Sequence, residues 1–404
     1  MTPAARLAAA VDILAALDPD RPVEPQLKAW SRANRYAGSK DRRAIADRVY
    51  TVLRRRRTCA AQGGGGAARA LVLGSLVQAD GASVGEIEAL CRGGYGLAPL
   101  DDAERTALGR SPDWESEAER LDWPDWLWEE ALEAFGPQTA RELDALRQRA
   151  PLDLRVNTLK ATAPEARQAL EEDGAIARAD IVEVPDLPSA LRLPSGFPVL
   201  ANRAWREGLV ELQDAGSQAV AAMTAARPGE TVLDFCAGAG GKTLALAATM
   251  RNEGHLFAYD VAPVRMADLP ERAERAGATC ITVVESEDLP AFEGKVDRVL
   301  VDAPCSGSGS WRRDPAGKWR LTPERLADLT EMQDDALDAA ARFVRPGGTL
   351  LYATCSILRS EDEERVAAFL HRHDRFTLDE TRRLHPARDG CDGFFAARMT
   401  LTGC

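Results

Sequence analysis

The chain has 404 residues, of which 45% are hydrophobic and 28% are charged, and its formal net charge is −12. This length predicts two or three domains, and the composition is typical of a folded globular protein. The sequence holds no apolar run of about 18 residues, which argues against a membrane span, and its acidic balance argues against indiscriminate nucleic-acid binding.

The cysteines and the N-terminal segment point to an intracellular protein. The first residues lack the basic segment and the cleavage site of a secretory signal. The eight cysteines and four histidines do not fall at zinc-binding spacings. We therefore expect a cytoplasmic, monomeric protein with reduced thiols, with no metal site and no membrane partner.

Residues 1–125 show the Ala/Leu/Arg periodicity of helices and little strand signal, so they predict an all-helical domain. Four consecutive glycines at 63–66 interrupt this pattern and predict a flexible loop. Residues 28–57 carry eleven Lys or Arg residues against two acids. Two interpretations fit this basic stretch, which are a solvated helix face and a surface that contacts RNA.

Residues 126–205 predict a small α+β linking module. In and just before this region, WPDWLWEEALEAFG is typical of a helix that ends at Gly136, and LDLRVNTLK is typical of a strand. TAPEARQALEEDG then predicts a capped helix with Pro164 near its start.

Residues 206–404 alternate between strand and helix patterns. The strand candidates are ETVLDFC, HLFAYD, CITVVE, DRVLVDAP and TLLYATC. This alternation predicts an α/β fold with a parallel sheet and helices on both of its faces. In such folds ligands bind beyond the carboxyl ends of the strands, where every candidate site residue below is found.

A glycine-rich turn, CAGAGGKT, joins the first of these strands to a helix. It is not a P-loop, because Cys236 stands where the first glycine is needed, and it is not the dinucleotide pattern, because Thr243 stands in place of the third glycine. The next strand ends in Asp260, an acid that suits the hydroxyls of a ribose. Together these features favour S-adenosylmethionine over a triphosphate, and the alternative is a purely structural turn.

Two cysteines follow neighbouring strands of the predicted sheet. Asp302 and Cys305 lie just past the fourth strand, and Cys355 ends the fifth. Because adjacent strands are roughly 4.8 Å apart, both thiols are expected to open into one crevice beside the cofactor. The alternative is that each cysteine is a small apolar core residue.

These segments carry a family resemblance. The stretches DAPCSGSG, RRDP, YATCS, CAGAGGKT, ELQDAGSQAV and DGFFAARM closely resemble the Sun-type RNA 5-methylcytosine methyltransferases, in particular their RsmB-like branch. The resemblance covers about residues 120–404, and SKDRRAIADRVYTVLRR more weakly resembles the NusB-like helical domain of that branch. It implies a Rossmann-like methyltransferase domain, S-adenosyl-L-methionine as cofactor, and small-subunit (16S) ribosomal RNA as the favoured partner.

The resemblance also implies roles for the site residues. A thiolate that adds to carbon 6 of cytosine makes carbon 5 nucleophilic, which is covalent catalysis. Cys355 would be the attacking nucleophile, Cys305 would assist release of the product, and Asp302 would bind the base. The chemistry alone leaves the inverted assignment of the two cysteines open.

The residues implied to contact the cofactor are Cys236, Ala237, Gly238, Ala239, Gly240, Gly241, Lys242, Asp260, Arg265, Glu287 and Asp302. For the acid after the third strand, Asp288 remains an alternative to Glu287. The family usually has Ala-Pro where Gly238 and Ala239 stand, so we expect a more mobile loop and weaker cofactor binding. The glycine run at 63–66 is expected to loosen the NusB-like part.

The loop after the first cysteine motif, SWRRDPAGKWR, interleaves tryptophans with cations. Trp311, Arg312, Arg313 and Lys318 are candidates for stacking on and pairing with single-stranded RNA, and the alternative is a loop packed by its tryptophans. A helix is expected to follow, capped by Thr322. The acids at 361–364 are expected to form the first turn of another helix.

Two other functions remain open from the sequence. One is methylation of transfer RNA, whose enzymes would share the same core motifs. The other is a non-catalytic RNA-binding or assembly factor with the same fold.

Overall fold

The computed structural model describes residues 1–92, 96–172 and 176–403. The chain forms two compact units, each described below by itself. Unit 1 consists of Met1–Gln148 and Trp311–Leu321, and unit 2 consists of Arg149–Ser310 and Thr322–Cys404. A segment from the C-terminal half of the sequence is therefore part of the N-terminal unit.

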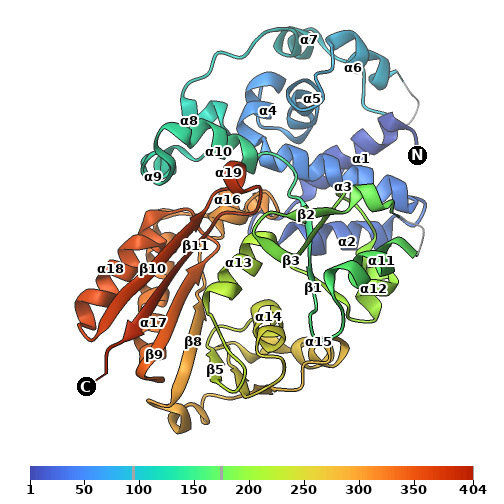
Figure 1. The fold of residues 1–404 in the computed structure, drawn as a ribbon. Coiled ribbons are helices and arrows are strands. Elements are labelled where there is room, and N and C mark those ends of the chain that lie inside the picture. Colours follow the sequence, from blue (N-terminus) through green and yellow to red (C-terminus); the bar gives the residue numbers. More distant parts are fainter. Residues whose placement is uncertain (93–95, 173–175, 404) are drawn as a thin grey trace. The chain divides into compact units, whose positions relative to one another are not determined.

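Unit 1 is helical throughout its described residues (Figure 1). Its helices are α1 (Pro3–Ala16), α2 (Val23–Ala33), α3 (Ser39–Arg54), α4 (Arg56–Gly63), α5 (Ala68–Gln78), α6 (Val84–Cys91), α7 (Asp102–Gly109), α8 (Glu117–Arg120), α9 (Trp128–Phe135), α10 (Thr139–Leu146) and α16 (Pro315–Arg320). Their apolar faces bury one core, to which α1, α3 and α5 contribute Ile13, Ile45, Val49 and Leu73. This helical unit continues to Gln148, past the expected boundary at residue 125.

The glycine run forms a tight corner between α4 and α5. Gly63 ends α4, and Gly64 caps it in the left-handed conformation with φ of 80°. A Cβ atom on Gly63 would lie 2.0 Å from the carbonyl oxygen of Ala70, and one on Gly74 would lie 2.0 Å from that of Cys59. The expected loosening is therefore wrong, because the missing side chains let the two helices approach closely.

The first sheet of unit 2 is antiparallel and has the strand order β2-β3-β1-β4. Its elements are β1 (Leu152–Val156), α11 (Ala163–Glu172), β2 (Val182–Val184), β3 (Leu187–Leu193), α12 (Arg203–Arg206) and β4 (Val210–Leu212). The strand and the capped helix expected here are present, with Thr162 bonded to Glu165 at the helix start. The expected end of that helix at 173–174 lies outside the described residues.

The second sheet has seven strands in the order β10-β11-β9-β8-β5-β6-β7. Its elements are α13 (Ala215–Met223), β5 (Thr231–Asp234), α14 (Gly241–Thr249), β6 (His255–Ala258), α15 (Leu269–Ala276), β7 (Ile281–Val283), β8 (Val296–Asp302), α17 (Pro323–Ala341), β9 (Val344–Thr354), α18 (Glu363–Arg372), β10 (Phe376–Leu384), α19 (Pro386–Asp389) and β11 (Phe394–Leu401). The five strands expected from the sequence pair in parallel. The two C-terminal strands add to them in antiparallel fashion, which the sequence analysis did not predict.

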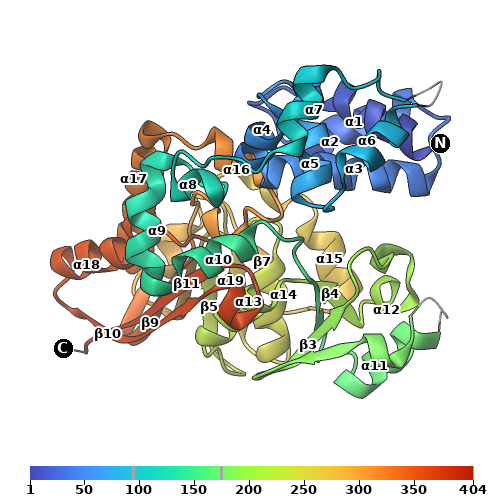
Figure 2. The ribbon, with the colours of Figure 1, turned by 90° about the horizontal axis from the view of Figure 1, so that it is seen from above.

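Helices cover both faces of this sheet, as expected. Along β5, Val232 faces a core shared with α13, α14 and α15, whereas Leu233 faces the opposite core, shared with α17 and α18. This alternation follows from the twofold period of a strand, and the two helical layers can be followed in Figure 2. The strand order reverses between β5 and β8, which is where such sheets bind ligands.

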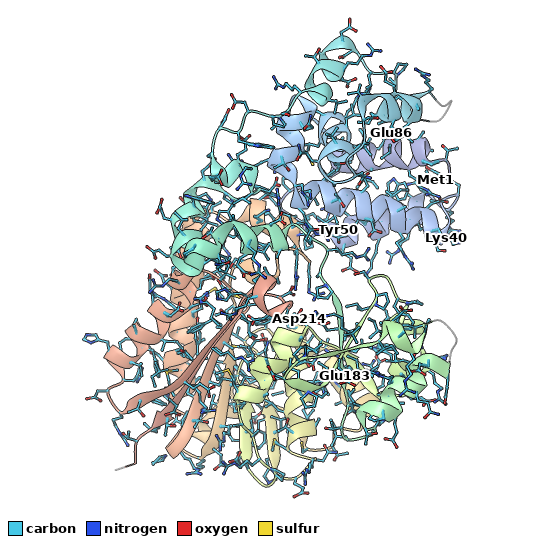
Figure 3. The ribbon with its side chains drawn as sticks, turned by 45° about the horizontal axis from the view of Figure 1, so that its top comes forward. Met1, Lys40, Tyr50, Glu86, Glu183 and Asp214 are labelled. Carbon is cyan, nitrogen blue, oxygen red and sulfur yellow. The ribbon has the colours of Figure 1, made fainter. Side chains whose placement is uncertain are left out.

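Asp214, labelled in Figure 3, caps the start of α13. Its Oδ1 atom accepts hydrogen bonds from the amides of Gly216 (2.8 Å) and Asp392 (3.2 Å). The same carboxylate thus caps a helix and ties it to the segment that leads into β11. None of the helices in the described ranges combines the length and apolar character needed to cross a bilayer.

The close α4–α5 crossing gives a stability prediction. We expect Gly74→Ala to lower the free energy of unfolding by about 1–3 kcal/mol, because the added methyl group overlaps the Cys59 carbonyl. Gly85→Ala is the matched control, since a Cβ there meets nothing within 4 Å and alanine favours a helix. Urea denaturation followed by far-ultraviolet circular dichroism measures both variants. Equal unfolding midpoints would contradict the steric argument.

Candidate active site

Two cysteines meet at the carboxyl ends of β8 and β9. The strands pair in parallel with Asp302 opposite Ala353, so Cys305 and Cys355 emerge side by side. Their Sγ atoms are 3.4 Å apart, and both residues are half-buried. The prediction that the two thiols lie next to each other is therefore confirmed, whereas their opening into a crevice beside the cofactor stays a prediction.

The two thiols differ in acidity. The hydrogen bond from the Cys305 thiol lowers the pKa of Cys355 below its ordinary value, although burial alone would raise it. The positive charge of the nearby Lys242 ammonium also lowers the pKa of Cys355. The same hydrogen bond, together with burial, raises the pKa of Cys305 well above its ordinary value. Cys355 is therefore the more acidic thiol of the pair, and the thiolate is the nucleophilic form of a cysteine.

A partly buried ion pair lies beside the thiols. Lys242, in the first turn of α14, places its Nζ 2.6 Å from Oδ2 of Asp302 at the end of β8. Burial alone would lower the pKa of Lys242, but the charge and hydrogen bond of Asp302 raise it. The ammonium group also lies 5.5 Å from the centre of the Phe394 ring. The carboxylate of Asp302 thus keeps the Lys242 ammonium charged although it is buried.

The loop between β5 and α14 is held by backbone hydrogen bonds. The amide of Ala237 donates to Tyr259 O (2.9 Å), and that of Gly240 donates to Ala237 O (2.9 Å). Gly238 and Gly240 have φ of 52° and 80°, and a Cβ on Gly240 would lie 2.3 Å from Leu269. The guanidinium of Arg272 donates to the carbonyl of Ala239. These contacts do not support the expectation of a more mobile loop.

Asp260 anchors this loop from the neighbouring strand. It is buried, and its two carboxylate oxygens accept from the amides of Gly238 (3.0 Å) and Ala262 (2.9 Å). Arg265, which is half-exposed, lies 3.1 Å from the same carboxylate. Glu287 is exposed, whereas Asp288 accepts from the amide of Glu285 within a local turn. Their contacts to a cofactor stay predictions.

Asp234, the last residue of β5, is a site residue that the sequence analysis missed. Its Oδ2 accepts from the Thr243 hydroxyl at 2.7 Å, while its buried Oδ1 has no hydrogen-bond partner among the described residues. Burial raises the pKa of Asp234 to about 7. Its position directly before the glycine-rich turn could have identified Asp234 as a site residue from the sequence.

The residues around the loop fit S-adenosylmethionine. The unpaired oxygen of Asp234 is an acceptor for an ammonium group, and a Cβ on Gly241 would meet nothing within 4 Å, so the helix start is open. Amides at a helix N-terminus favour a carboxylate. A carboxylate and an ammonium are the two charged groups of the methionine part of this cofactor.

Glu361 is the second site residue that was missed, because the expected first turn of a helix holds for Glu363 and Glu364 but Glu361 precedes that helix, at the end of a short 3-10 helix (Arg359–Glu361). Helix α18 begins at Glu363, whereas Glu361 and Asp362 are fully buried. Glu361 accepts from the amide (2.7 Å) and hydroxyl (2.5 Å) of Ser306, the hydroxyl of Ser356 (2.5 Å) and the Gln333 amide (3.0 Å). It thus joins the residues that directly follow the two cysteines. Burial raises the pKa of Glu361, and these donors oppose the shift.

The structure contradicts the predicted RNA-facing roles of three side chains in the tryptophan loop. Trp311, Arg312 and Lys318 are all buried within unit 1. Trp311 lies 5.0 Å from Trp123 between ring centres, and Lys318 Nζ donates to the Arg54 carbonyl at 3.2 Å. Burial lowers the pKa of Lys318 to about 8.

Arg313 is the exception, because it is exposed. The alternative reading, a loop packed by its tryptophans, therefore holds for the rest of this group. The helix expected after the loop is present as α17, with Thr322 as its N-cap.

Two family models match the chain. The model for 16S rRNA methyltransferase RsmB/F matches residues 221–400, and the ferredoxin-like domain of RsmF/B-like methyltransferases matches residues 123–200. The ribosomal RNA small subunit methyltransferase B of Salmonella paratyphi C is 35% identical over 286 residues, which cover 68% of this chain and 66% of that protein. The Erwinia tasmaniensis protein of the same name is 36% identical with the same coverage.

Solved structures share the fold. PH0851 has a TM-score of 0.80 and 26% identity, with 99% of each chain covered. A methyltransferase homologue from Pyrococcus horikoshii has a TM-score of 0.61 and 25% identity, covering 70% of this chain and 97% of its own. The matched segment spans just under two thirds of the length of the curated relatives, at 66%. With both family models and relatives of about one-third identity in agreement, the chain belongs to the RsmB/F methyltransferase family.

Proposed function

We propose that the protein is an S-adenosylmethionine-dependent methyltransferase that modifies carbon 5 of a cytosine in small-subunit ribosomal RNA. The observation that carries this proposal is the pair of thiols 3.4 Å apart, of which Cys355 has the lowered pKa. A thiolate at the end of β9, beside a partly buried ammonium–carboxylate pair, suits covalent activation of a pyrimidine. The small-subunit methyltransferases among the relatives support ribosomal RNA as the substrate.

The proposed reaction begins when the Cys355 thiolate adds to carbon 6 of the cytosine. Electron density then moves to carbon 5, and Asp302 and Lys242 bind the polarised base. S-adenosylmethionine, held by the loop at residues 236–242 with Asp260, Arg265 and Glu287, supplies an electrophilic methyl group when bound. Once carbon 5 carries the methyl group, water takes the proton from carbon 5, and the bond between carbon 6 and sulfur breaks with its electron pair leaving on sulfur as the Cys355 thiolate. Cys305 is close enough to assist this release.

The target base must leave its stack to reach these thiols, so a loop or bulge of the RNA is the proposed substrate. Cys305 and Cys355 are free thiols, which suits the proposed cytoplasmic location. A monomeric state remains a prediction.

Methyl transfer to unmethylated small-subunit ribosomal RNA tests the proposal. We expect label from the cofactor to appear in 5-methylcytosine after nuclease digestion and mass spectrometry of the nucleosides. Label in transfer RNA alone would retain the chemistry and overturn the substrate. No label in any RNA, with cofactor binding intact by calorimetry, would instead favour a non-catalytic assembly factor.

Exchange of each cysteine tests the assignment of roles. We expect Cys355→Ala to abolish methylation, because the attacking thiolate is lost. We expect Cys305→Ala to accumulate a covalent protein–RNA adduct, because release is impaired while attack is not. Denaturing gel electrophoresis of each variant with RNA and cofactor separates the outcomes. An adduct with Cys355→Ala and none with Cys305→Ala would show that the roles are inverted.

The buried Glu361 is proposed to position both cysteines. We expect Glu361→Gln to lower kcat by about 10²-fold, because the amide group would face at least one of the donors and displace the loops. The cofactor affinity should change little, since Glu361 contacts no part of the cofactor loop in the structure. Glu364→Gln, an exposed acid in the same run, is the matched control.

Steady-state kinetics and calorimetry with S-adenosylmethionine measure these effects, and circular dichroism checks that each variant is folded. Equal kcat values for a folded Glu361→Gln and its control would refute the positioning role.

A further inference from the structure

Unit 1 contains a cavity of about 310 Å³ that no part of the proposed reaction uses. It lies among the C-terminal end of α1, the start of α2, the junction of α3 with α4, and α16. Its volume falls within the roughly 300–1,000 Å³ range of ligand pockets. Its apolar wall includes Leu14, Val23, Leu53 and Leu71.

Trp319 of α16 gives the cavity an aromatic wall of fixed orientation. Its indole Nε1 donates to the carbonyl of Leu53 at 2.8 Å, so the ring cannot rotate freely. The ring is half-buried, and it attracts cations: the Nζ of Lys318 lies 4.6 Å, and the guanidinium carbon of Arg56 6.0 Å, from a ring centroid. Aromatic ring faces and guanidinium planes are the groups on which unstacked bases stack.

Three arginines line the same cavity. Arg21 and Arg56 are exposed, and among the described residues no ion pair or hydrogen-bond acceptor is found for either guanidinium, although that of Arg56 contacts the Trp319 ring. Arg320 donates to Asp314 through Nη2 at 2.8 Å, but its buried Nη1 has no acceptor among the described residues. An unsatisfied buried donor is costly, so a ligand oxygen at this position would be stabilising.

One acid also lines the cavity. Asp18 uses Oδ1 to accept from the amide of Asp20 at 3.0 Å, and this side of the cavity is therefore negative. A carboxylate repels phosphate but accepts hydrogen bonds from the amino groups of cytosine or guanine. The cavity thus offers cations for a phosphate and an acceptor for a base edge.

The charge around the cavity narrows the class of ligand. The chain as a whole carries −12, yet residues 28–57, which end beside the cavity, hold eleven cationic side chains against two acids. Such local concentration of positive charge in an acidic protein favours a polyanion over a neutral metabolite. The stretch that the sequence left open between a solvated face and an RNA surface therefore adjoins a built pocket.

We propose that this cavity binds one unstacked nucleotide of a single-stranded segment of the substrate RNA, away from the cytosine that is methylated. Arg21 and Arg56 bind the phosphates, Trp319 contacts the base, and Arg320 and Asp18 bind its polar edge. This inference rests on the proposed function for the identity of the RNA. It replaces the predicted contacts of Trp311, Arg312 and Lys318, whose side chains are buried.

Binding of full-length protein to unmethylated small-subunit ribosomal RNA fragments, measured by fluorescence anisotropy over a range of salt concentrations, tests the cavity. We expect the double variant Arg21→Ala/Arg56→Ala to bind at least tenfold more weakly and to lower the slope of log K against log salt by about 2. The value of kcat at saturating RNA and the affinity for S-adenosylmethionine should be unchanged, so the loss appears in KM.

The matched control is Arg35→Ala/Arg43→Ala, which removes the same charge from exposed positions of unit 1 outside the cavity. An equal loss of RNA affinity in both double variants would refute the cavity as a binding site and would indicate diffuse electrostatic attraction instead. Crosslinking of 4-thiouridine-substituted RNA to the peptide that contains Trp319 is a second expected result, and its absence in a bound complex would also overturn the proposal.

The test separates this inference from the proposed function. If the wild-type protein binds RNA through the cavity but forms no 5-methylcytosine, the proposal for the cavity stands and the proposed enzymatic activity is refuted. If the cavity variants bind protein-free RNA normally but no longer bind a ribosomal particle, the cavity contacts protein, and the proposal is wrong.

Discussion

The parallel pairing of β8 with β9 is the constraint on which the site depends. Because Asp302 lies opposite Ala353, the two strands end at the same level, and the residues that follow them lie close together. The two cysteines come together 50 positions apart in sequence through this register. A shift of one residue would turn the side chains of β9 to the other face of the sheet. The strand register thus places the Cys305 thiol where its hydrogen bond lowers the pKa of Cys355.

Hydrogen bonds then fix what the strands bring together. Glu361 binds the residues after both cysteines, and Lys242 joins the cofactor loop to the end of β8 through Asp302. A buried carboxylate, Glu361, and a half-buried one, Asp302, therefore hold three segments that carry the proposed chemistry. Burying such charges is costly, and it is tolerated only where donors or a counter-ion compensate, as they do for both acids.

The sequence predicted the parts of this molecule that local patterns determine. Periodicity located five strands, and the rule that neighbouring parallel strands end together placed Cys305 beside Cys355. The burial of Lys318 was not predictable in this way, because its partner Arg54 lies 264 positions away. The same holds for Glu361, which a local charge run assigned to a helix, while its donors come from Ser306 and Gln333. The glycine run also led to a wrong prediction, because glycine is typical both of flexible loops and of close contacts between helices.

The path of the chain between the two units has a consequence for how the protein can be divided. Trp311–Leu321 belongs to unit 1, although it is inserted between β8 and α17 of unit 2. A fragment that starts at Arg149 would keep this segment and lose its helical partners. Trp311 and the apolar side of α16 would then face water, which favours aggregation. The helical unit therefore cannot be removed without loss, because a segment inserted in the sequence of unit 2 belongs to it.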